Sequence, residues 1–145
     1  MSNSNYVDKV VLSVEDFDSW TVGRWTPDSI PDNGDYSIDF SNSLISFERV
    51  LMGFDPINKE FALDKLDASK LISVLNKIID KGGLPPSMRV MDSSRNYKMT
   101  VYDDDGFDIC KLEWNNHDAE NSADPDSKEL FMIVDSILSK INAKR

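Results

Sequence analysis

Three consecutive aspartates stand directly before a glycine, and this stretch, residues 103–106, is the part of the sequence closest to a cation-binding loop. In the calcium loop of an EF-hand, glycine takes the sixth position, and the first and twelfth positions supply side-chain oxygens. With Gly106 sixth, Val101 stands first and Leu112 stands twelfth, and neither side chain can bind calcium. The sequence therefore predicts no metal site and no cofactor. Low-affinity cation binding by the aspartates stays open.

The residues that could act as nucleophiles or bases do not form a known catalytic set. His117 is the only histidine, and no serine lies in a Gly-x-Ser-x-Gly turn. Cys110 is the only cysteine, and its predicted strand position points it into the core, away from any zinc site. Gly82-Gly83 follows a predicted helix, whereas a phosphate-binding loop precedes one. The sequence thus favours a protein that is not an enzyme.

The aspartates belong to a predicted β-hairpin over residues 97–114. Asp105-Gly106 suits a two-residue type I′ turn, in which both central residues have a positive φ. That turn gives one apolar face, with Val101 opposite Cys110, Met99 opposite Leu112 and Tyr97 opposite Trp114. It gives one polar face, with Tyr102 opposite Ile109, Thr100 opposite Lys111 and Lys98 opposite Glu113. A three-residue turn would shift the register by one residue and mix the faces, so we expect the shorter turn.

A second hairpin is predicted over residues 36–48, with Asn42-Ser43 as its turn, Phe40 opposite Ile45 and Ile38 opposite Phe47. Further strands are expected over residues 6–14 and 59–63, and a short one over 88–91. Whether the aromatic residues within 15–35 join the sheet stays open.

Two amphipathic helices are predicted, one over residues 67–81 capped by Asp67 and one that begins at Asp124-Pro125. The fold class that follows is α+β, an antiparallel β-sheet built from hairpins with two amphipathic helices packed on one face. We expect residues 1–145 to form a single domain, with residues 1–5 as a flexible tail.

The chain has a net charge of −10, and this charge restricts its partners. A negative surface repels phosphate, so nucleic acid and anionic membranes are not expected as partners. No apolar run reaches the ~18 residues of a membrane span, and the first residues do not resemble a secretion signal. A lone cysteine suits a reducing compartment. We therefore expect a cytoplasmic protein.

Most of the charge is concentrated in one part of the sequence. Residues 103–129 contain ten acidic residues and two lysines, a net −8 of the chain's −10. Such a patch can attract a basic protein and accelerate association, although it could also serve only solubility. Tyr102, on the polar face of the hairpin, is the expected aromatic anchor, and Trp114 is expected in the core. The candidate partner-binding residues are Tyr102, Asp103, Asp104, Asp105, Asp108, Asp118, Glu120 and Asp124.

A small acidic α+β chain with this patch resembles the bacterial immunity proteins that neutralise toxins of contact-dependent inhibition and polymorphic toxin systems. The resemblance lies in size, acidity and the 103–129 patch, and it extends loosely over the whole chain. It implies an inhibitor that binds a basic toxin, expected to be a nuclease, in a stoichiometric complex. The alternatives are a small enzyme or ligand-binding module with a site formed by distant residues, and an adaptor or chaperone-like protein. The partner's identity, the oligomeric state and the strand order do not follow from the sequence.

Overall fold

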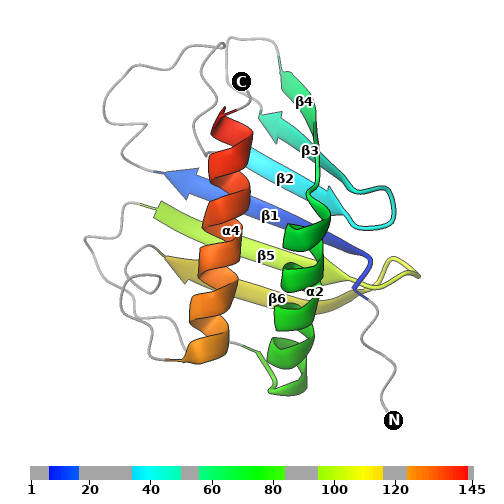
Figure 1. Cartoon of the computed structure of the whole chain (residues 1–145), viewed down its shortest axis with the longest axis vertical. Helices are drawn as coiled ribbons and strands as arrows, with labels where there is room; N and C mark the ends of the chain where they lie inside the picture. Colours follow the sequence, from blue (N-terminus) through cyan, green and yellow to red (C-terminus); the bar gives the residue numbers. More distant parts are fainter. Residues whose placement is uncertain (1–6, 17–33, 50–55, 84–94, 116–123, 144–145) are drawn as a thin grey trace.

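The computed structural model describes residues 7–16, 34–49, 56–83, 95–115 and 124–143, which form a sheet and a pair of helices (Figure 1). The sheet is six-stranded and antiparallel, in the order β4-β3-β2-β1-β5-β6. Its strands are β1 (Lys9–Asp16), β2 (Gly34–Asp39), β3 (Leu44–Arg49), β4 (Ile57–Ala62), β5 (Arg95–Tyr102) and β6 (Asp108–Asn115). The helices are α2 (Lys65–Asp80) and α4 (Pro125–Ala143). The predicted α+β class is confirmed.

Strand β1 joins the two halves of the sheet. It pairs with β2 on one side and with β5 on the other, both antiparallel. The β2–β3 and β5–β6 turns therefore lie at the same end of the sheet, on the right of Figure 1. Several predictions fall outside the described residues, namely the tail over 1–5, the strand over 88–91 and most of residues 15–35.

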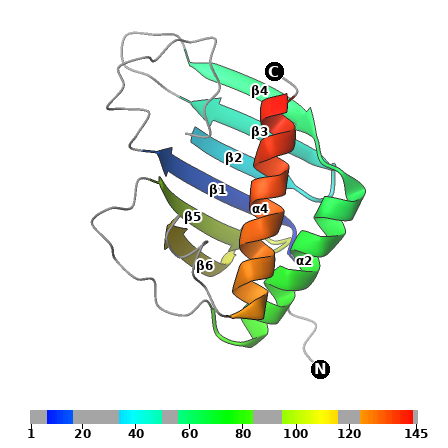
Figure 2. The same cartoon turned by 60° about the vertical axis from the view of Figure 1, so that its left-hand side comes forward.

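The core lies between the sheet and the two helices, which cover the same face of the sheet (Figure 2). Alternate strand residues point toward the helices and are buried, as the predicted one-sided hairpins require. The helices contribute a buried stripe each, Leu71, Val74, Leu75 and Ile78 from α2 and Leu130, Ile133, Val134, Ile137, Leu138 and Ile141 from α4. No helix among the described residues is both long and apolar enough to cross a membrane.

Strands β5 and β6 keep the predicted register over most of their length. The predicted pairs Val101–Cys110, Thr100–Lys111, Met99–Leu112, Lys98–Glu113 and Tyr97–Trp114 are all present. Tyr102, however, pairs with Asp108 and not with Ile109. Ile109 is thus an extra residue on β6, which makes a β-bulge beside the turn.

The predicted turn of this hairpin is wrong, because Asp105 does not have the positive φ that a type I′ turn requires. Ser43 is the only described residue other than glycine with a positive φ. In this turn only Gly106 has a positive φ, of 87°. The turn is therefore longer than two residues, and the bulge restores the register that a longer turn alone would shift.

The β2–β3 hairpin keeps the predicted faces but not the predicted partners. Ile45 pairs with Ile38 and not with Phe40. The turn is longer than the predicted Asn42-Ser43 pair, because the Asp39 carboxylate accepts hydrogen bonds from the amides that follow it, including Asn42 N at 3.2 Å. Since the partners shift by two residues, every side chain stays on its predicted face.

Helix α2 begins earlier than the predicted Asp67. Asp64 caps it, because its Oδ1 accepts a hydrogen bond from Leu66 N at 3.1 Å. Asp67 lies in the first turn and is buried, and its Oδ2 accepts a hydrogen bond from Lys140 Nζ at 2.7 Å. The predicted start at Asp124-Pro125 is confirmed for α4, which runs from Pro125.

Gly34 should tolerate alanine much less well than Gly82. Both have a positive φ, 138° at Gly34 and 92° at Gly82. A Cβ at Gly34 would also meet the buried ring of Phe47, with Cζ 2.9 Å away, whereas a Cβ at Gly82 would meet nothing within 4 Å. We expect Gly34→Ala to cost about 1–3 kcal/mol more than Gly82→Ala in urea unfolding. Equal costs would show that the ring can move aside.

Candidate functional site

The hairpin tip, defined here as residues 103–108, has a backbone held by its own hydrogen bonds. Asp103 N donates to Phe107 O at 3.0 Å, and Gly106 N donates to Asp103 O at 3.1 Å. The Asp103 side chain adds two more, because its Oδ1 accepts from Asp105 N at 3.0 Å and from Phe107 N at 2.9 Å. Asp103 therefore fixes the shape of the turn and with it the positions of the neighbouring side chains.

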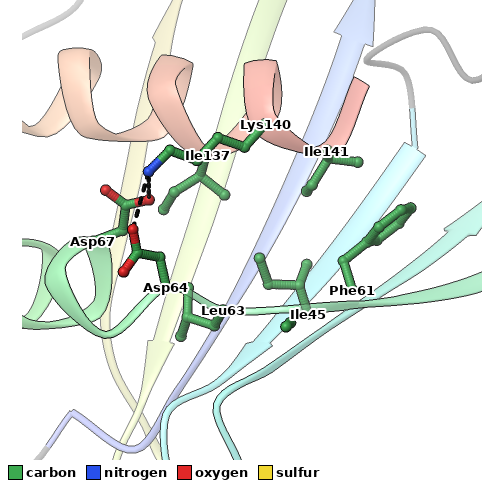
Figure 3. Close-up of a pocket in the computed structure, with 9 residues that line it drawn as sticks. Ile45, Phe61, Leu63, Asp64, Asp67, Ile137, Lys140 and Ile141 are labelled. Atoms are coloured by element: carbon green, nitrogen blue, oxygen red, sulfur yellow. Dashed lines mark hydrogen bonds and ion pairs between the residues drawn. The ribbon is translucent and has the colours of Figure 1, made fainter. Parts of the chain in front are cut away.

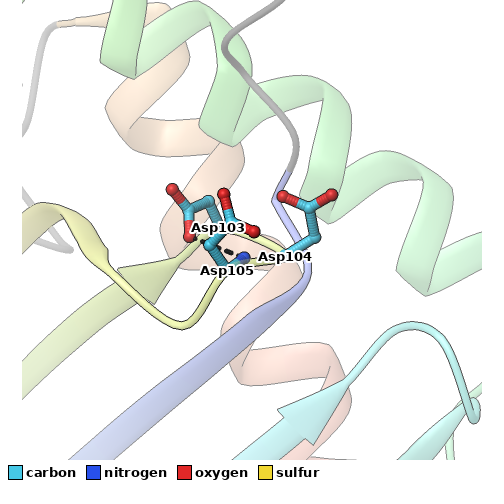
Figure 4. Close-up of side chains that lie close together, drawn as sticks. All are labelled: Asp103, Asp104 and Asp105. Carbon is cyan, nitrogen blue, oxygen red and sulfur yellow. Dashed lines mark hydrogen bonds between the residues drawn. The ribbon is translucent and has the colours of Figure 1, made fainter.

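The structure brings three of the predicted residues together at the tip (Figure 4). Carboxylate oxygens of Asp103, Asp104 and Asp105 lie within 4.8 Å of one another. Asp104 and Asp105 are exposed, and neither forms a salt bridge with any described residue. Two unit charges at such a distance repel by about 1 kcal/mol even in water. The tip thus keeps a concentrated negative charge, which no described lysine or arginine neutralises at Asp104 and Asp105.

A calcium ion would need more oxygen ligands than this cluster offers. Calcium takes roughly six to eight of them. The three carboxylates are the only group of three or more acidic, histidine or cysteine side chains so close together among the described residues. One of them, Asp103, already accepts two backbone hydrogen bonds. The geometry suits attraction of a cationic surface better than coordination of a metal.

Asp108 and Tyr102, at the base of the tip, each have a lysine nearby. Asp108 Oδ2 lies 3.5 Å from Lys111 Nζ in an exposed ion pair, which is worth little because water screens it. Tyr102 is half-buried, and Lys9 Nζ lies 6.0 Å from the centre of its ring. Tyr102 is therefore less available as an anchor than we expected from the sequence.

Phe107 is the residue of the tip that sequence reasoning missed. Its side chain is 69 % exposed and stands between the aspartates of the turn and Asp108. A large apolar side chain that the fold leaves in water is available to a partner, and aromatic residues contribute strongly to interfaces. The sequence signal for it is an aromatic residue placed directly after the turn glycine.

Asp124 lies away from the tip, at the start of α4, which is at the bottom of Figure 1. Its Oδ2 accepts hydrogen bonds from Ser127 N at 3.1 Å and Ser127 Oγ at 2.6 Å, and its Oδ1 lies 2.9 Å from Lys81 Nζ. The Ser127 hydroxyl, and next the Lys81 ammonium, lower the pKa of Asp124 to about 2. Asp124 therefore has a structural role with its charge compensated, while Asp118 and Glu120 lie outside the described residues.

The lowered pKa of Asp124 predicts a pH dependence of stability. The ordinary pKa of this carboxyl is 3.8, so its contribution is fully present well above that pH and is lost as the pH falls toward 2. Asp124→Asn keeps a capping side chain but removes the titrating group. Urea unfolding from about pH 5 to pH 2 should show a steeper loss in the wild type than in Asp124→Asn. Parallel curves would contradict this role of Asp124.

A small cavity lies where α4 ends against α2 and the strands β3 and β4 (Figure 3). Its volume is about 30 Å³, and apolar side chains such as Ile45, Ile137 and Ile141 line it. At one side Lys140 Nζ contacts Asp67 at 2.7 Å and Asp64 at 3.2 Å, and these carboxylates, Asp67 first, raise the pKa of Lys140. The cavity has room for little more than one water molecule, so it does not support an enzyme that binds substrate there.

The comparisons with known proteins add no relative. No protein-family model matches the chain, and no curated protein sequence matches it.

Proposed function

We propose that this chain is a protein-binding inhibitor that blocks a basic toxin, of the kind that bacterial immunity proteins neutralise. The observation that supports this most is the hairpin tip, where three carboxylates lie within 4.8 Å of one another beside the exposed Phe107. A toxin that acts on nucleic acid carries a basic groove for phosphate, and a cluster of carboxylates is complementary to such a groove. A nuclease is therefore the class of toxin that we favour.

The tip combines the two features that protein interfaces need. Its carboxylates attract a basic surface over distance and thereby raise the association rate, which long-range charge affects most. Phe107, next to these aspartates in sequence, offers an exposed apolar side chain whose burial would slow dissociation. Because the hydrogen bonds of Asp103 already hold the backbone, little conformational entropy is lost when the tip docks.

The test uses the protein encoded by the open reading frame directly upstream of this one, where an immunity protein's toxin is expected. We expect that protein to be basic and toxic when expressed alone, and harmless when co-expressed with this chain. Purified together, the two should form a complex in a fixed ratio that survives gel filtration at low salt. An upstream product that stays toxic in the presence of an excess of this chain would contradict the proposal.

A further inference from the structure

The face of the sheet opposite the helices carries an open hollow of about 610 Å³ over β2, β3 and β4. Small or short side chains form its floor, since Val11, Ser37 and Ser46 stand on three neighbouring strands, β1, β2 and β3. They alternate along each strand with residues buried under the helices, so the floor belongs to the face of the sheet that points away from the helices. The hollow shares no residue with the hairpin tip.

Three acidic side chains surround this floor, Asp35 on β2, Glu48 on β3 and Glu60 on β4. All three are exposed, and none forms a salt bridge with a described residue. Asp35 accepts a hydrogen bond from Ser13 Oγ at 2.7 Å, which orients it without neutralising it. Lys59 also lines the hollow, so the described lining has three acidic groups and one basic group.

The sheet pairing makes this arrangement unfavourable in the free protein. Asp35 stands directly opposite Glu48 in the β2–β3 pairing. Like charges in such pairs have Cβ atoms about 5 Å apart and destabilise a sheet. On the side of Asp35 away from Glu48, Asp35 pairs with Ser13 on β1, and Ser13 pairs with Lys98 on β5. Lys98, the nearest cation in this line of paired residues, is therefore two strands, or about 10 Å, from Asp35. A local conflict of this kind points to a use in binding.

The composition of the hollow suits guanidinium groups better than a metal ion. Among the described residues, only the tip aspartates bring three ligand atoms within 4.8 Å, so the hollow's carboxylates stand too far apart for one ion. Arginine carries five N–H donors in a planar fork and no acceptor. The carboxylates of Glu48 and Glu60 and the hydroxyls of Ser37 and Ser46 all accept hydrogen bonds.

We infer that this hollow binds an extended, arginine-bearing segment of a partner protein. The hollow is open along the sheet and its acidic side chains are exposed, which suits a chain lying across the strands better than an enclosed small molecule. Acidic groups on three adjacent strands would face arginine side chains that project from one side of the segment. This goes beyond the proposed function, because it assigns a second binding surface. Binding at the hollow can be disproved while the proposed role of the hairpin tip still holds.

The test is an NMR titration of the ¹⁵N-labelled full chain with a short peptide of alternating arginine and serine. Shift changes should be largest at the backbone amides of Ser37, Ser46 and Asn58. The corresponding lysine peptide should bind more weakly because it lacks the planar fork, and the glutamate peptide should not bind. Absence of binding by the arginine peptide, or shift changes centred on the hairpin tip, would overturn the inference.

Two charge-matched variants separate the hollow from general attraction. Glu48→Gln with Glu60→Gln removes two charges at the hollow, at positions whose side chains are exposed. We expect it to weaken binding of the arginine peptide about fivefold to tenfold. Asp104→Ser with Asp105→Ser removes two charges at the tip and should leave that affinity nearly unchanged. Equal weakening by both variants would mean that net charge alone attracts the peptide, and the inference would be wrong.

Discussion

Replacing Trp114 with alanine should lower the free energy of unfolding by about 3–5 kcal/mol. Trp114 is 3 % exposed and lies between two other aromatic rings. Its ring centre is 5.1 Å from that of Tyr97 on the neighbouring strand and 4.9 Å from that of Phe131 on α4. The Trp114 side chain thus connects the β5–β6 hairpin to the helix layer. Its removal creates a cavity and removes two stacking contacts.

Phe107→Ala is the matched control, because it also removes an aromatic side chain from the same hairpin. Phe107 is 69 % exposed, so we expect its loss to change stability by less than about 0.5 kcal/mol. Urea unfolding followed by far-UV circular dichroism measures both variants without depending on tryptophan fluorescence. If Trp114→Ala cost no more than Phe107→Ala, the described packing of α4 against β6 would be wrong.

Reversing the charges of the tip should slow association with the basic partner by about 10- to 1,000-fold at low ionic strength. The variant is Asp104→Lys, Asp105→Lys and Asp108→Lys together. Asp103 is left in place because its side chain holds the backbone of the turn. Asp105 has no positive φ, so lysine fits its backbone conformation. Stopped-flow mixing with the upstream gene product measures the rate, and the dissociation rate should change less than the association rate.

The control for that experiment changes the net charge equally at other places. The control variant reverses three exposed acids away from the tip, through Glu15→Lys, Glu113→Lys and Glu129→Lys. Glu15 and Glu113 lie near the ends of β1 and β6 that are far from the tip, and Glu129 lies on α4. We expect this variant to associate at close to the wild-type rate. If both triple variants slowed association equally, the total charge of the protein would control the encounter and the tip would have no special part in it.

The fold class, the hairpins and both helices could be predicted because their signals are local and periodic. The alternation of apolar and polar residues along β5 and β6 was strong enough to predict five of the cross-strand residue pairs that the structure contains. The turns were harder to predict, because backbone hydrogen bonds accepted by a single carboxylate decide the length of each turn. Asp103 and Asp39 each accept backbone amide hydrogen bonds that favour a longer turn, and a pattern of apolar residues does not register such bonds.

The predicted acidic patch is contiguous in sequence, but the structure separates its described members. Asp103, Asp104 and Asp105 gather at the tip, whereas Asp124 pairs with Lys81 at the junction of the two helices. That pairing joins residues 43 positions apart, so counting charges along the chain does not find it. The hollow was missed for the same reason, since Asp35, Glu48 and Glu60 become neighbours only through the sheet pairing.

The salt dependence of association tests the central claim most directly, namely that charge at the hairpin tip brings a basic partner to this chain. The rate constant for the wild-type chain and the upstream gene product would be measured from about 0.01 M to 1 M salt, where the Debye length falls from about 30 Å to about 3 Å. We predict a steep fall for the wild type and a much shallower one for the tip variant. A wild-type rate constant that is the same at both ends of that range would contradict the claim.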